Sequence, residues 1–283
     1  MCKICMAHGG GKKWFEVKRH VETKFARQMG FEPWERDHWQ YVHQQYAKLA
    51  AQAGDSLADP TMKETIKQIM TDMILQIHPL TKGVPFTFPQ GHGSQVVTLQ
   101  EMEGLIKLSG EPYRIECLCR KMIANVSDRC CTPLGLHGET AEMFPSMGEK
   151  AERISVDEAI ELVRQFNAQG RVHTVAGTPL PIALAPCHCE LPYCIALRPR
   201  VDMGFKYVLK SHWVAKVDQD KCTGCKTCLS RCQFHAVRHS EKMGRSMIDM
   251  WNCYGCGLCA ETCPEKAIKL LPRESIPALK DEW

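Results

Sequence analysis

The pattern of apolar and polar residues predicts two helices in the first third of the chain. The first spans residues 34–53 and the second spans residues 60–77. The second has the cleaner apolar stripe, which repeats every three or four residues: Ile66, Ile69, Met70, Met73, Ile74 and Ile77. Pro60 opens this helix and Pro79 follows it, so both ends carry a helix boundary signal.

After a stretch rich in proline and glycine, residues 79–93, the pattern predicts a short helix and then a strand. The helix covers residues 98–109 and the strand covers residues 113–118. The order of helix, helix and strand is compatible with a winged-helix-like unit. We expect such a unit to serve as a scaffold or docking surface rather than to read DNA.

A capping box predicts another helix in the middle of the chain. Ser155 and Glu158 stand three residues apart, so each side chain can bond to a backbone amide of the first turn. The helix is expected to run through Gln169 and to stop at the glycine that follows, and its buried side is Ile160, Leu162, Val163 and Phe166. Strands are then predicted over residues 171–175 and 182–185.

Two cysteine runs near the C-terminal end carry the most specific signal. Both read C-x2-C-x2-C-x3-C: Cys222, Cys225, Cys228 and Cys232, then Cys253, Cys256, Cys259 and Cys263. Bacterial ferredoxins hold two [4Fe–4S] clusters with this spacing, and the fourth cysteine of each run ligates the other cluster. We therefore expect cluster one to take Cys222, Cys225, Cys228 and Cys263. Cluster two would take Cys253, Cys256, Cys259 and Cys232.

The residues around the two runs repeat as well. Gly224 and Gly255 occupy equivalent places inside the loops, where the backbone must approach a cluster closely. Pro264 follows the second run, whereas Gln233 takes that place after the first, a departure that touches a turn and not a ligand. Paired C-x2-C motifs also occur in zinc ribbons. The match of all eight cysteines to the ferredoxin spacing favours iron–sulfur clusters over zinc.

Nine further cysteines lie outside these runs, in three groups. The groups are C-x2-C-x2-H at Cys2, Cys5 and His8; C-x-C-Arg at Cys117 and Cys119, with Cys130 and Cys131 soon after; and C-x-C-x4-C at Cys187, Cys189 and Cys194. A free cysteine is often simply a small buried residue. That explanation covers one or two of the nine, but closely spaced pairs favour metal ligation by at least four of them.

Composition and charge narrow the class of protein. The formal charge of +4 falls near zero once each cluster site adds about −2, and no basic patch indicates a nucleic-acid partner. No run of apolar residues is long enough to span a membrane. The opening residues do not read as a secretory signal, so 17 cysteines indicate metal binding in a reducing cytosol rather than disulfides. We expect a cytoplasmic protein.

The sequence divides into three parts of an α+β protein. Residues 1–110 form a helical, winged-helix-like N-terminal region that would dock a partner. Residues 111–211 form a cysteine-rich α+β region with a possible third metal site. Residues 212–283 form a bacterial-type 2[4Fe–4S] ferredoxin domain with a C-terminal tail, which we expect to contact a partner or to pack back on the N-terminal region.

From Ser155 onward the chain resembles anaerobic dicluster ferredoxin-like iron–sulfur proteins, with a capped helix, a strand at residues 170–173, a cysteine-rich motif and a dicluster domain. The C-x-C-Arg motif and the opening CKICMAHGGGKKWF are similar to the same set. The resemblance implies cytoplasmic electron transfer in anaerobic metabolism, usually with a larger redox enzyme. The chain departs from the denser CxCCxCC-type pattern, because His188 separates Cys187 from Cys189.

We therefore predict a third metal site, with a [4Fe–4S] cluster favoured over zinc. Its ligands are predicted to be Cys119, Cys187, Cys189 and Cys194, and Cys130 or Cys131 could replace one of them. The N-terminal group of Cys2, Cys5 and His8 could join this site, bind zinc separately or bind nothing. His188 could ligate, donate a hydrogen bond to a sulfur or face solvent.

The leading prediction for function is an electron-transfer protein or subunit without catalytic residues of its own, because no dinucleotide-binding fingerprint or other catalytic motif is present. It would relay electrons through two [4Fe–4S] clusters and a third to or from a larger redox enzyme. The alternative is a reductase or reductive activator whose upstream site keeps an open coordination position. A redox-sensing regulator that uses the winged-helix-like segment is a third interpretation.

Overall fold

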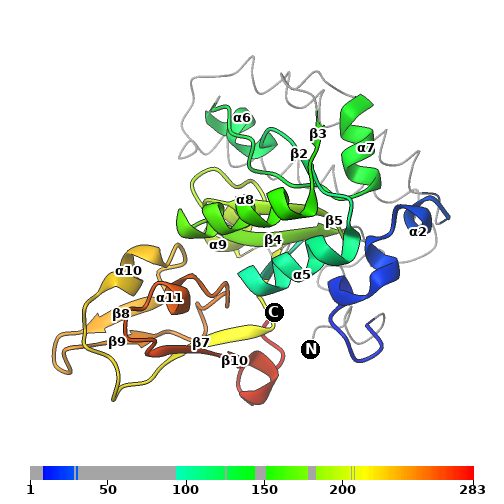
Figure 1. The fold of residues 1–283 in the computed structure, drawn as a ribbon. Coiled ribbons are helices and arrows are strands. Elements are labelled where there is room, and N and C mark those ends of the chain that lie inside the picture. The colour runs from blue at the N-terminus through cyan, green and yellow to red at the C-terminus, as the bar shows by residue number, and fades with distance from the viewer. Residues whose placement is uncertain are drawn as a thin grey trace.

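The computed structural model describes residues 9–28, 30, 94–124, 126–143, 151–177, 183–204, 206 and 208–283. The helices predicted over residues 34–53 and 60–77 lie outside these residues, as do Cys2, Cys5 and His8. The described part is a mixed α/β structure with several small sheets (Figure 1). None of its helices has the length and apolar character that crossing a membrane requires.

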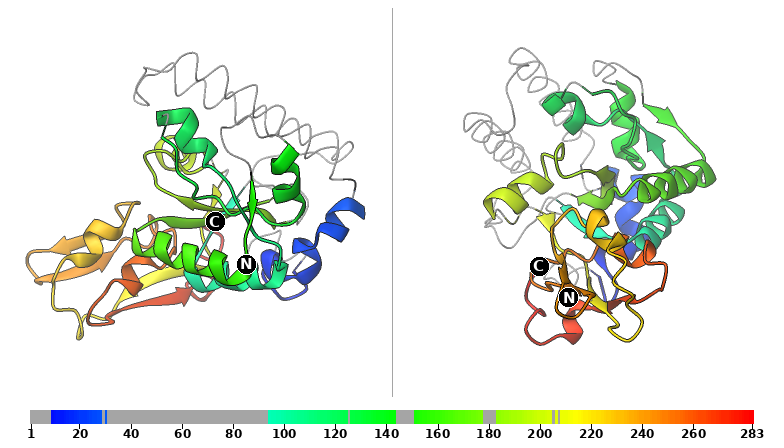
Figure 2. Two further views of the ribbon diagram at one scale, coloured as in Figure 1. Left: turned by 45° about the horizontal axis from the view of Figure 1, so that its top comes forward. Right: turned by 90° about the vertical axis from the view of Figure 1, so that its left-hand side faces the viewer.

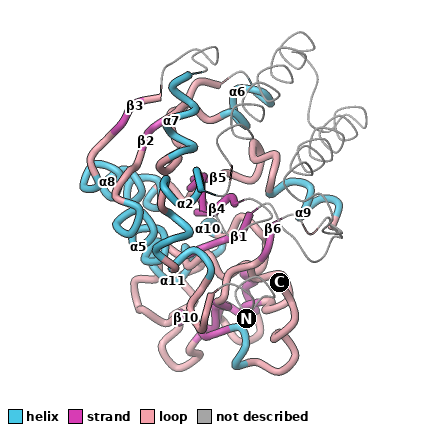
Figure 3. The backbone as a smooth tube through the Cα atoms, turned by 90° about the vertical axis from the view of Figure 1, so that its right-hand side faces the viewer, coloured by secondary structure: helices cyan, strands magenta, loops and turns pink. Residues whose placement is uncertain are grey.

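A four-stranded sheet lies at the centre of the molecule. Its order is β5 (Ala183–Cys189), β4 (Val172–Gly177), β1 (Ser94–Val97) and β6 (Val208–Leu209). Strand β4 runs antiparallel to both of its neighbours, whereas β1 and β6 are parallel. Helices α5 (Leu99–Ser109) and α8 (Val156–Ala168) lie side by side against one face, and α9 (Leu197–Met203) lies on the other side (Figure 3).

Both helices on the first face begin with a capping box. In α8 the Ser155 hydroxyl accepts a hydrogen bond from the Glu158 amide at 3.2 Å, and the Glu158 carboxylate accepts from the Ser155 amide at 2.9 Å. This confirms the predicted helix start. Helix α5 has the same arrangement at Thr98 and Glu101, and it confirms the helix predicted over residues 98–109.

The predicted strands differ more from the structure. Only Tyr113–Arg114 of the strand predicted over residues 113–118 is regular, as β2, because Leu118 already begins helix α6 (Leu118–Ala124). Strand β5 is longer than the predicted segment over residues 182–185, since its pairing with β4 continues to Cys189. The cysteine motif around His188 is therefore part of the central sheet and not a loop.

A small two-stranded antiparallel sheet of β2 with β3 (Glu152–Arg153) lies above the central sheet in Figure 1, together with α6 and α7 (Leu136–Met143). The winged-helix-like unit is not confirmed. Helix α5 packs against α8, which follows it by almost fifty residues in the sequence, and both cover the sheet. The predicted domain boundary at residue 110 stays a prediction. Strand β1, on the N-terminal side of this boundary, pairs with β4 on its C-terminal side.

Neighbouring residues of β1 face opposite sides of the sheet, as the alternation of a strand requires. Val97 packs against Met102 and Ile106 of α5, in the larger core. Two short 3-10 helices add to this core, η1 (Trp14–Glu16) and η2 (Lys18–Val21), and α2 (Thr23–Gln28) follows them. Val96 faces the other way and packs among residues of the C-terminal domain, including Tyr254.

The C-terminal domain has two small sheets and two short helices. Strand β7 (Trp213–Val217) pairs antiparallel with β10 (Ile268–Pro272), and β8 (Val237–Ser240) forms a hairpin with β9 (Arg245–Ile248). Helices α10 (Thr227–Arg231) and α11 (Leu258–Glu261) contact each other. Figure 2 shows this domain packed beside the central sheet.

The tail after β10 packs partly on the C-terminal domain itself and partly on the larger core. It begins with the short helix η5 (Arg273–Ser275). Leu279 is buried in the core of the C-terminal domain, with Ile276 packed against it. Trp283 packs against the larger core and meets the His212 ring edge-on, with ring centroids 5.0 Å apart.

Candidate metal centres

The C-terminal domain contains two cavities lined by cysteines, and each has the cysteine composition predicted for one cluster. The first is lined by Cys222, Cys225, Cys228 and Cys263, together with apolar residues that include Val217 and Ile268. The second is lined by Cys232, Cys253, Cys256 and Cys259, with Phe234 and Tyr254 among its apolar residues. Each cavity thus joins three cysteines of one run to the fourth of the other, which is the crossed arrangement of dicluster ferredoxins.

Two glycines let the backbone close tightly around these cavities. Gly224 and Gly255 have φ of +72° and +70°, a conformation that side chains other than glycine's rarely adopt. A Cβ atom at Gly224 would lie 2.0 Å from the carbonyl oxygen of Gly244, and one at Gly255 would lie 2.0 Å from that of Trp213. Both equivalent positions predicted from the repeat therefore require glycine for the same physical reason.

Backbone amides point at the sulfur atoms in both halves. The amide of Ala215 donates to Cys253 Sγ at 3.4 Å, and the amide of Ala267 donates to Cys263 Sγ at 3.3 Å. Such N–H···S bonds stabilise thiolates and tune the potential of a cluster. Ala215 lies in β7 and Ala267 directly precedes β10, so this pair of strands supports a ligand of each cluster.

The two cavities differ in burial. Cys225 of the first is exposed, and a hydrogen bond from Thr227 lowers the pKa of its thiol. Burial raises the pKa of Cys256 in the second cavity to about 12, and it also raises the pKa of Cys253 and Cys259. Metal binding must displace these protons, because only the thiolate is a ligand.

Two buried cations, Arg273 and Lys210, contact residues that line the second cavity. Arg273 is 0% exposed and donates to the carbonyl oxygens of Ser211, Trp213 and Cys253 at 2.8–3.0 Å. Its Nη1 has no hydrogen-bond partner among the described residues. Lys210 is also buried, and burial with the nearby Arg273 lowers its pKa to about 8. An anionic group beside them fits these charges, and a [4Fe–4S] cluster with four thiolates is such a group.

Seven cysteines from three segments gather upstream of the C-terminal domain. The side chains form a closed ring in which each thiol is within hydrogen-bonding range of the next, in the order Cys117, Cys119, Cys194, Cys189, Cys187 and Cys131, and then back to Cys117. The seventh, Cys130, contacts Cys117 and Cys131. The structure thus brings together the four cysteines predicted as ligands and adds three more to them.

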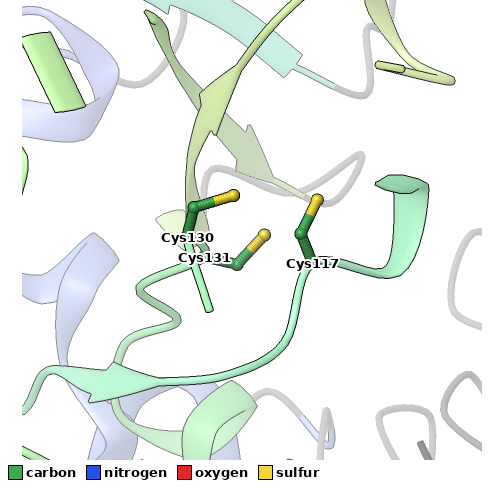
Figure 4. Close-up of side chains that lie close together, drawn as sticks. All are labelled: Cys117, Cys130 and Cys131. Atoms are coloured by element: carbon green, nitrogen blue, oxygen red, sulfur yellow. The ribbon is translucent and has the colours of Figure 1, made fainter. Parts of the chain in front are cut away.

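The added cysteines form a compact group of their own. The sulfur atoms of Cys117, Cys130 and Cys131 all lie within 4.8 Å of one another (Figure 4). Cys117 lies just before α6, whereas Cys130 and Cys131 lie on a neighbouring segment that bridges to Cys187 of β5. On the other side of the ring, Cys194 donates to Cys189 Sγ at 3.3 Å. The sequence left Cys117 out of the ligand set, and only the tertiary structure places it there.

The protonation of the ring is uneven. Hydrogen bonds with Cys119 and Cys189, together with one from the Leu197 amide, lower the pKa of Cys194 to about 5. A hydrogen bond with Cys117 and burial raise the pKa of Cys130 to about 12. All fifteen cysteines of the described residues are free thiols. A buried group of thiols without disulfides fits a site for a thiolate-bound metal.

His188 does not face solvent, which removes one of the three alternatives for it. It is 1% exposed, and its ring stacks on Phe166 with centroids 5.0 Å apart. Both ring nitrogens have partners, because Nδ1 lies 2.8 Å from His173 Nδ1 and Nε2 lies 2.9 Å from Thr132 Oγ1. The strand places it on the face of β5 opposite Cys187 and Cys189.

The bonds around this histidine fix its tautomer. Asn167 donates through its amide nitrogen to Glu261, so its Oδ1 accepts from His173 Nε2 at 3.2 Å. His173 Nδ1 must then accept from His188 Nδ1, and His188 Nε2 accepts from Thr132. Burial keeps both rings neutral by lowering the pKa of His173 to about 3 and that of His188 well below its usual value. The chain of bonds links the cysteine ring to α11 of the C-terminal domain.

Two arginines lie near the ring, and both form ion pairs with carboxylates. Arg120 lies 3.4 Å from Asp128 and 2.7 Å from Glu190. Arg171 lies 2.9 Å from Asp128 and 3.6 Å from Glu190. The group of two arginines and two carboxylates has no net charge, so it does not offset the charge of several thiolates.

Cysteines of the ring and of the second cavity pack in the same apolar core. Cys189 and Cys194 of the ring pack in it together with Cys232 and Cys256 of the cavity. Gln233 joins the two sites directly: its Oε1 accepts from the Leu191 amide at 2.7 Å, and its Nε2 donates to the carbonyl oxygen of Cys189 at 3.4 Å. The only signal of this residue in the sequence is that it replaces the proline of the ferredoxin motif, a departure expected to touch a turn and not a ligand.

Comparison with known proteins agrees with the two cavities. Residues 215–270 match the 4Fe-4S dicluster domain family. This range contains both cysteine runs and most of the paired strands β7 and β10.

Two curated proteins are similar to part of the chain. A probable iron–sulfur subunit of the Frd operon of Proteus vulgaris is 36% identical over 76 residues, which are 27% of this chain and 45% of that protein. The "Putative electron transport protein YsaA" of Escherichia coli (strain K12) is 33% identical over 95 residues, which are 32% of this chain and 57% of that protein. The chain thus spans about half the length of these relatives. Residues 215–270 of this chain belong to the 4Fe-4S dicluster domain family, and the protein is an iron–sulfur protein.

Proposed function

We propose that the protein transfers electrons through a line of three iron–sulfur centres, to or from a larger redox enzyme of anaerobic metabolism. Two are the [4Fe–4S] clusters of the C-terminal domain. The third is a [4Fe–4S] cluster held by Cys119, Cys187, Cys189 and Cys194. The observation that carries this proposal is the apolar cluster in which Cys189 and Cys194 pack with Cys232 and Cys256.

The packing supports an order for the centres. Cluster two would lie between cluster one and the upstream centre, because its ligands contact both neighbours. Cluster one has the exposed ligand Cys225, so electrons would exchange with a carrier at that end. The upstream centre would exchange electrons with the partner enzyme on the side of the molecule that carries α6 and α7. The printed names of the two similar proteins, one an electron transport protein and the other an iron–sulfur subunit, support this class of function.

The free thiols support a reducing compartment, and we place the protein in the cytoplasm. The neutral tautomer of His188 leaves neither ring nitrogen for a metal, so we give the upstream centre cysteine ligands alone. The centre therefore acts by gaining and losing electrons, and the buried chain of bonds from Thr132 to Glu261 holds its supporting strands in place.

The test is a redox titration of anaerobically purified protein, followed by low-temperature EPR. We expect signals from three iron–sulfur centres, and we expect the double variant Cys187→Ser with Cys189→Ser to lose the upstream one while both clusters of the C-terminal domain remain. If the double variant keeps the iron content and the EPR spectrum of the parent, these cysteines only pack. Protein that repeatedly contains zinc and no sulfide would contradict the whole proposal.

A further inference from the structure

The upstream ring has more thiols than one cluster of four irons needs. A [4Fe–4S] cube takes one thiolate at each of its four iron atoms. The ring and its neighbour Cys130 bring seven thiols into continuous contact, and Cys117, Cys130 and Cys194 among them are buried. Three thiols are therefore left over after the proposed ligands Cys119, Cys187, Cys189 and Cys194 have been assigned.

The three remaining thiols have the geometry of ligands rather than of core packing. Cys117, Cys130 and Cys131 come from two segments, and their sulfur atoms converge to within 4.8 Å of one another (Figure 4). Ordinary buried cysteines behave as small apolar residues and need not converge. The group is also continuous with the other four, because Cys117 contacts Cys119 and Cys131 contacts Cys187.

The balance of charge favours additional metal. Seven thiolates around one cubane core would carry about −5 in total, since an oxidised core supplies about +2. The nearby arginines cannot offset this charge, because Asp128 and Glu190 already pair with both Arg120 and Arg171. Buried uncompensated charge of this size is very costly. More iron in the site supplies the missing positive charge, whereas with one cube the three extra thiols must stay protonated.

We propose that the seven cysteines form one site for an iron–sulfur centre with more than four irons. Cys119, Cys187, Cys189 and Cys194 hold one part of it, and Cys117, Cys130 and Cys131 hold the added irons. The contacts from Cys117 to Cys119 and from Cys131 to Cys187 put the two parts in direct contact. This inference rests on the proposed function and deepens it, because it concerns the composition of the same upstream centre.

The experiment counts metal and sulfide in full-length protein that is purified without oxygen. Two clusters give about eight irons per chain, and a third cubane gives about twelve. We expect a count clearly above twelve, approaching about sixteen, with matching sulfide and with Mössbauer components beyond those of [4Fe–4S] cubes. About twelve irons, with or without added zinc, overturns this inference and leaves the proposed function intact. About eight irons overturns both.

A pair of variants assigns the added irons. In Cys117→Ser with Cys130→Ser we expect the iron count to fall towards about twelve while the EPR signals of the C-terminal clusters persist, which shows that the rest of the protein has folded. Ile115→Val is the matched control, because it changes buried packing on the same segment without removing a thiol. If the double variant keeps the parent's iron count and Mössbauer spectrum, Cys117 and Cys130 are not ligands and the inference is wrong.

Discussion

Gln233 accepts a hydrogen bond from the backbone amide of Leu191 at 2.7 Å, across the boundary between the C-terminal domain and the cysteine motif of the central sheet. The same side chain donates to the carbonyl oxygens of Gly170 and Cys189. Gln233 directly follows Cys232, a predicted ligand of cluster two. The Gln233 side chain thus forms hydrogen bonds between the backbone next to a predicted ligand of cluster two and the backbone of the upstream cysteine motif.

Replacing Gln233 with proline restores the ferredoxin motif and removes this connection. We expect Gln233→Pro to keep both C-terminal clusters but to slow electron transfer between cluster two and the upstream centre. The loss of its hydrogen bonds should also lower the free energy of unfolding by about 1–3 kcal/mol. Rapid-freeze EPR after mixing with a reductant measures the rate. Gln233→Ala, which lacks the proline ring, should behave in the same way. If both variants transfer electrons at the parental rate, the hydrogen bonds of Gln233 do not contribute to electron transfer between the two centres.

Arg273 should raise the reduction potential of cluster two. Its guanidinium is completely buried and donates to the Cys253 carbonyl oxygen at 2.8 Å, so it favours the state with one more electron. We expect Arg273→Gln to lower the potential of cluster two and to leave that of cluster one nearly unchanged, as measured by a potentiometric EPR titration. Arg273→Lys should restore part of the shift. The control is Arg238→Gln, since the Arg238 side chain is 67% exposed. Equal shifts in the reduction potentials of both clusters would mean that the charge of Arg273 does not act mainly on cluster two.

Gly224 should be indispensable for cluster one. An alanine Cβ there would meet the Gly244 carbonyl oxygen at 2.0 Å, in addition to the strain of a positive φ. Gly244 itself has φ of +63° but open space around its Cβ position, so Gly244→Ala is a matched control for the strain alone. We expect Gly244→Ala to cost about 1–2 kcal/mol and Gly224→Ala to cost about 1–3 kcal/mol more, with loss of cluster one. Thermal unfolding and iron content measure the difference, and equal effects of the two variants would remove the steric explanation.

Cys263 should serve cluster one although it belongs to the second run. It lines the same cavity as Cys222, Cys225 and Cys228. We expect Cys263→Ser to damage the EPR signal of cluster one and to spare that of cluster two. The reverse result, in which the centre held by Cys253, Cys256 and Cys259 is lost, would disprove the crossed arrangement.

The sequence predicted those features of this protein that depend on residues close together along the chain. The capping box at Ser155 and the eight-cysteine repeat each depend on fixed spacings, and the structure places both as expected. Strand β5 was predicted too short, because the sequence Cys187-His188-Cys189 reads as a metal motif, whereas in the structure these residues continue the antiparallel pairing with the preceding strand β4.

The upstream ring illustrates the same limit. Cys117 comes close to Cys131 only because the two segments bridge at Ile115, and Cys131 in turn bridges to Cys187 of β5. The second of these contacts joins segments that are more than fifty residues apart in the sequence, so spacing along the chain could not predict it. Gln233 was likewise visible only as a departure from a motif, whereas its role depends on the neighbouring domain.

The central claim is that an upstream iron–sulfur centre lies directly beside cluster two and exchanges electrons with it. The most direct measurement is low-temperature EPR of the fully reduced protein, compared with the Cys187→Ser and Cys189→Ser double variant. We expect magnetic coupling to the upstream centre to broaden the signal of cluster two in the parent. In the double variant we expect this broadening to disappear. A cluster two spectrum that is identical in both proteins would contradict it.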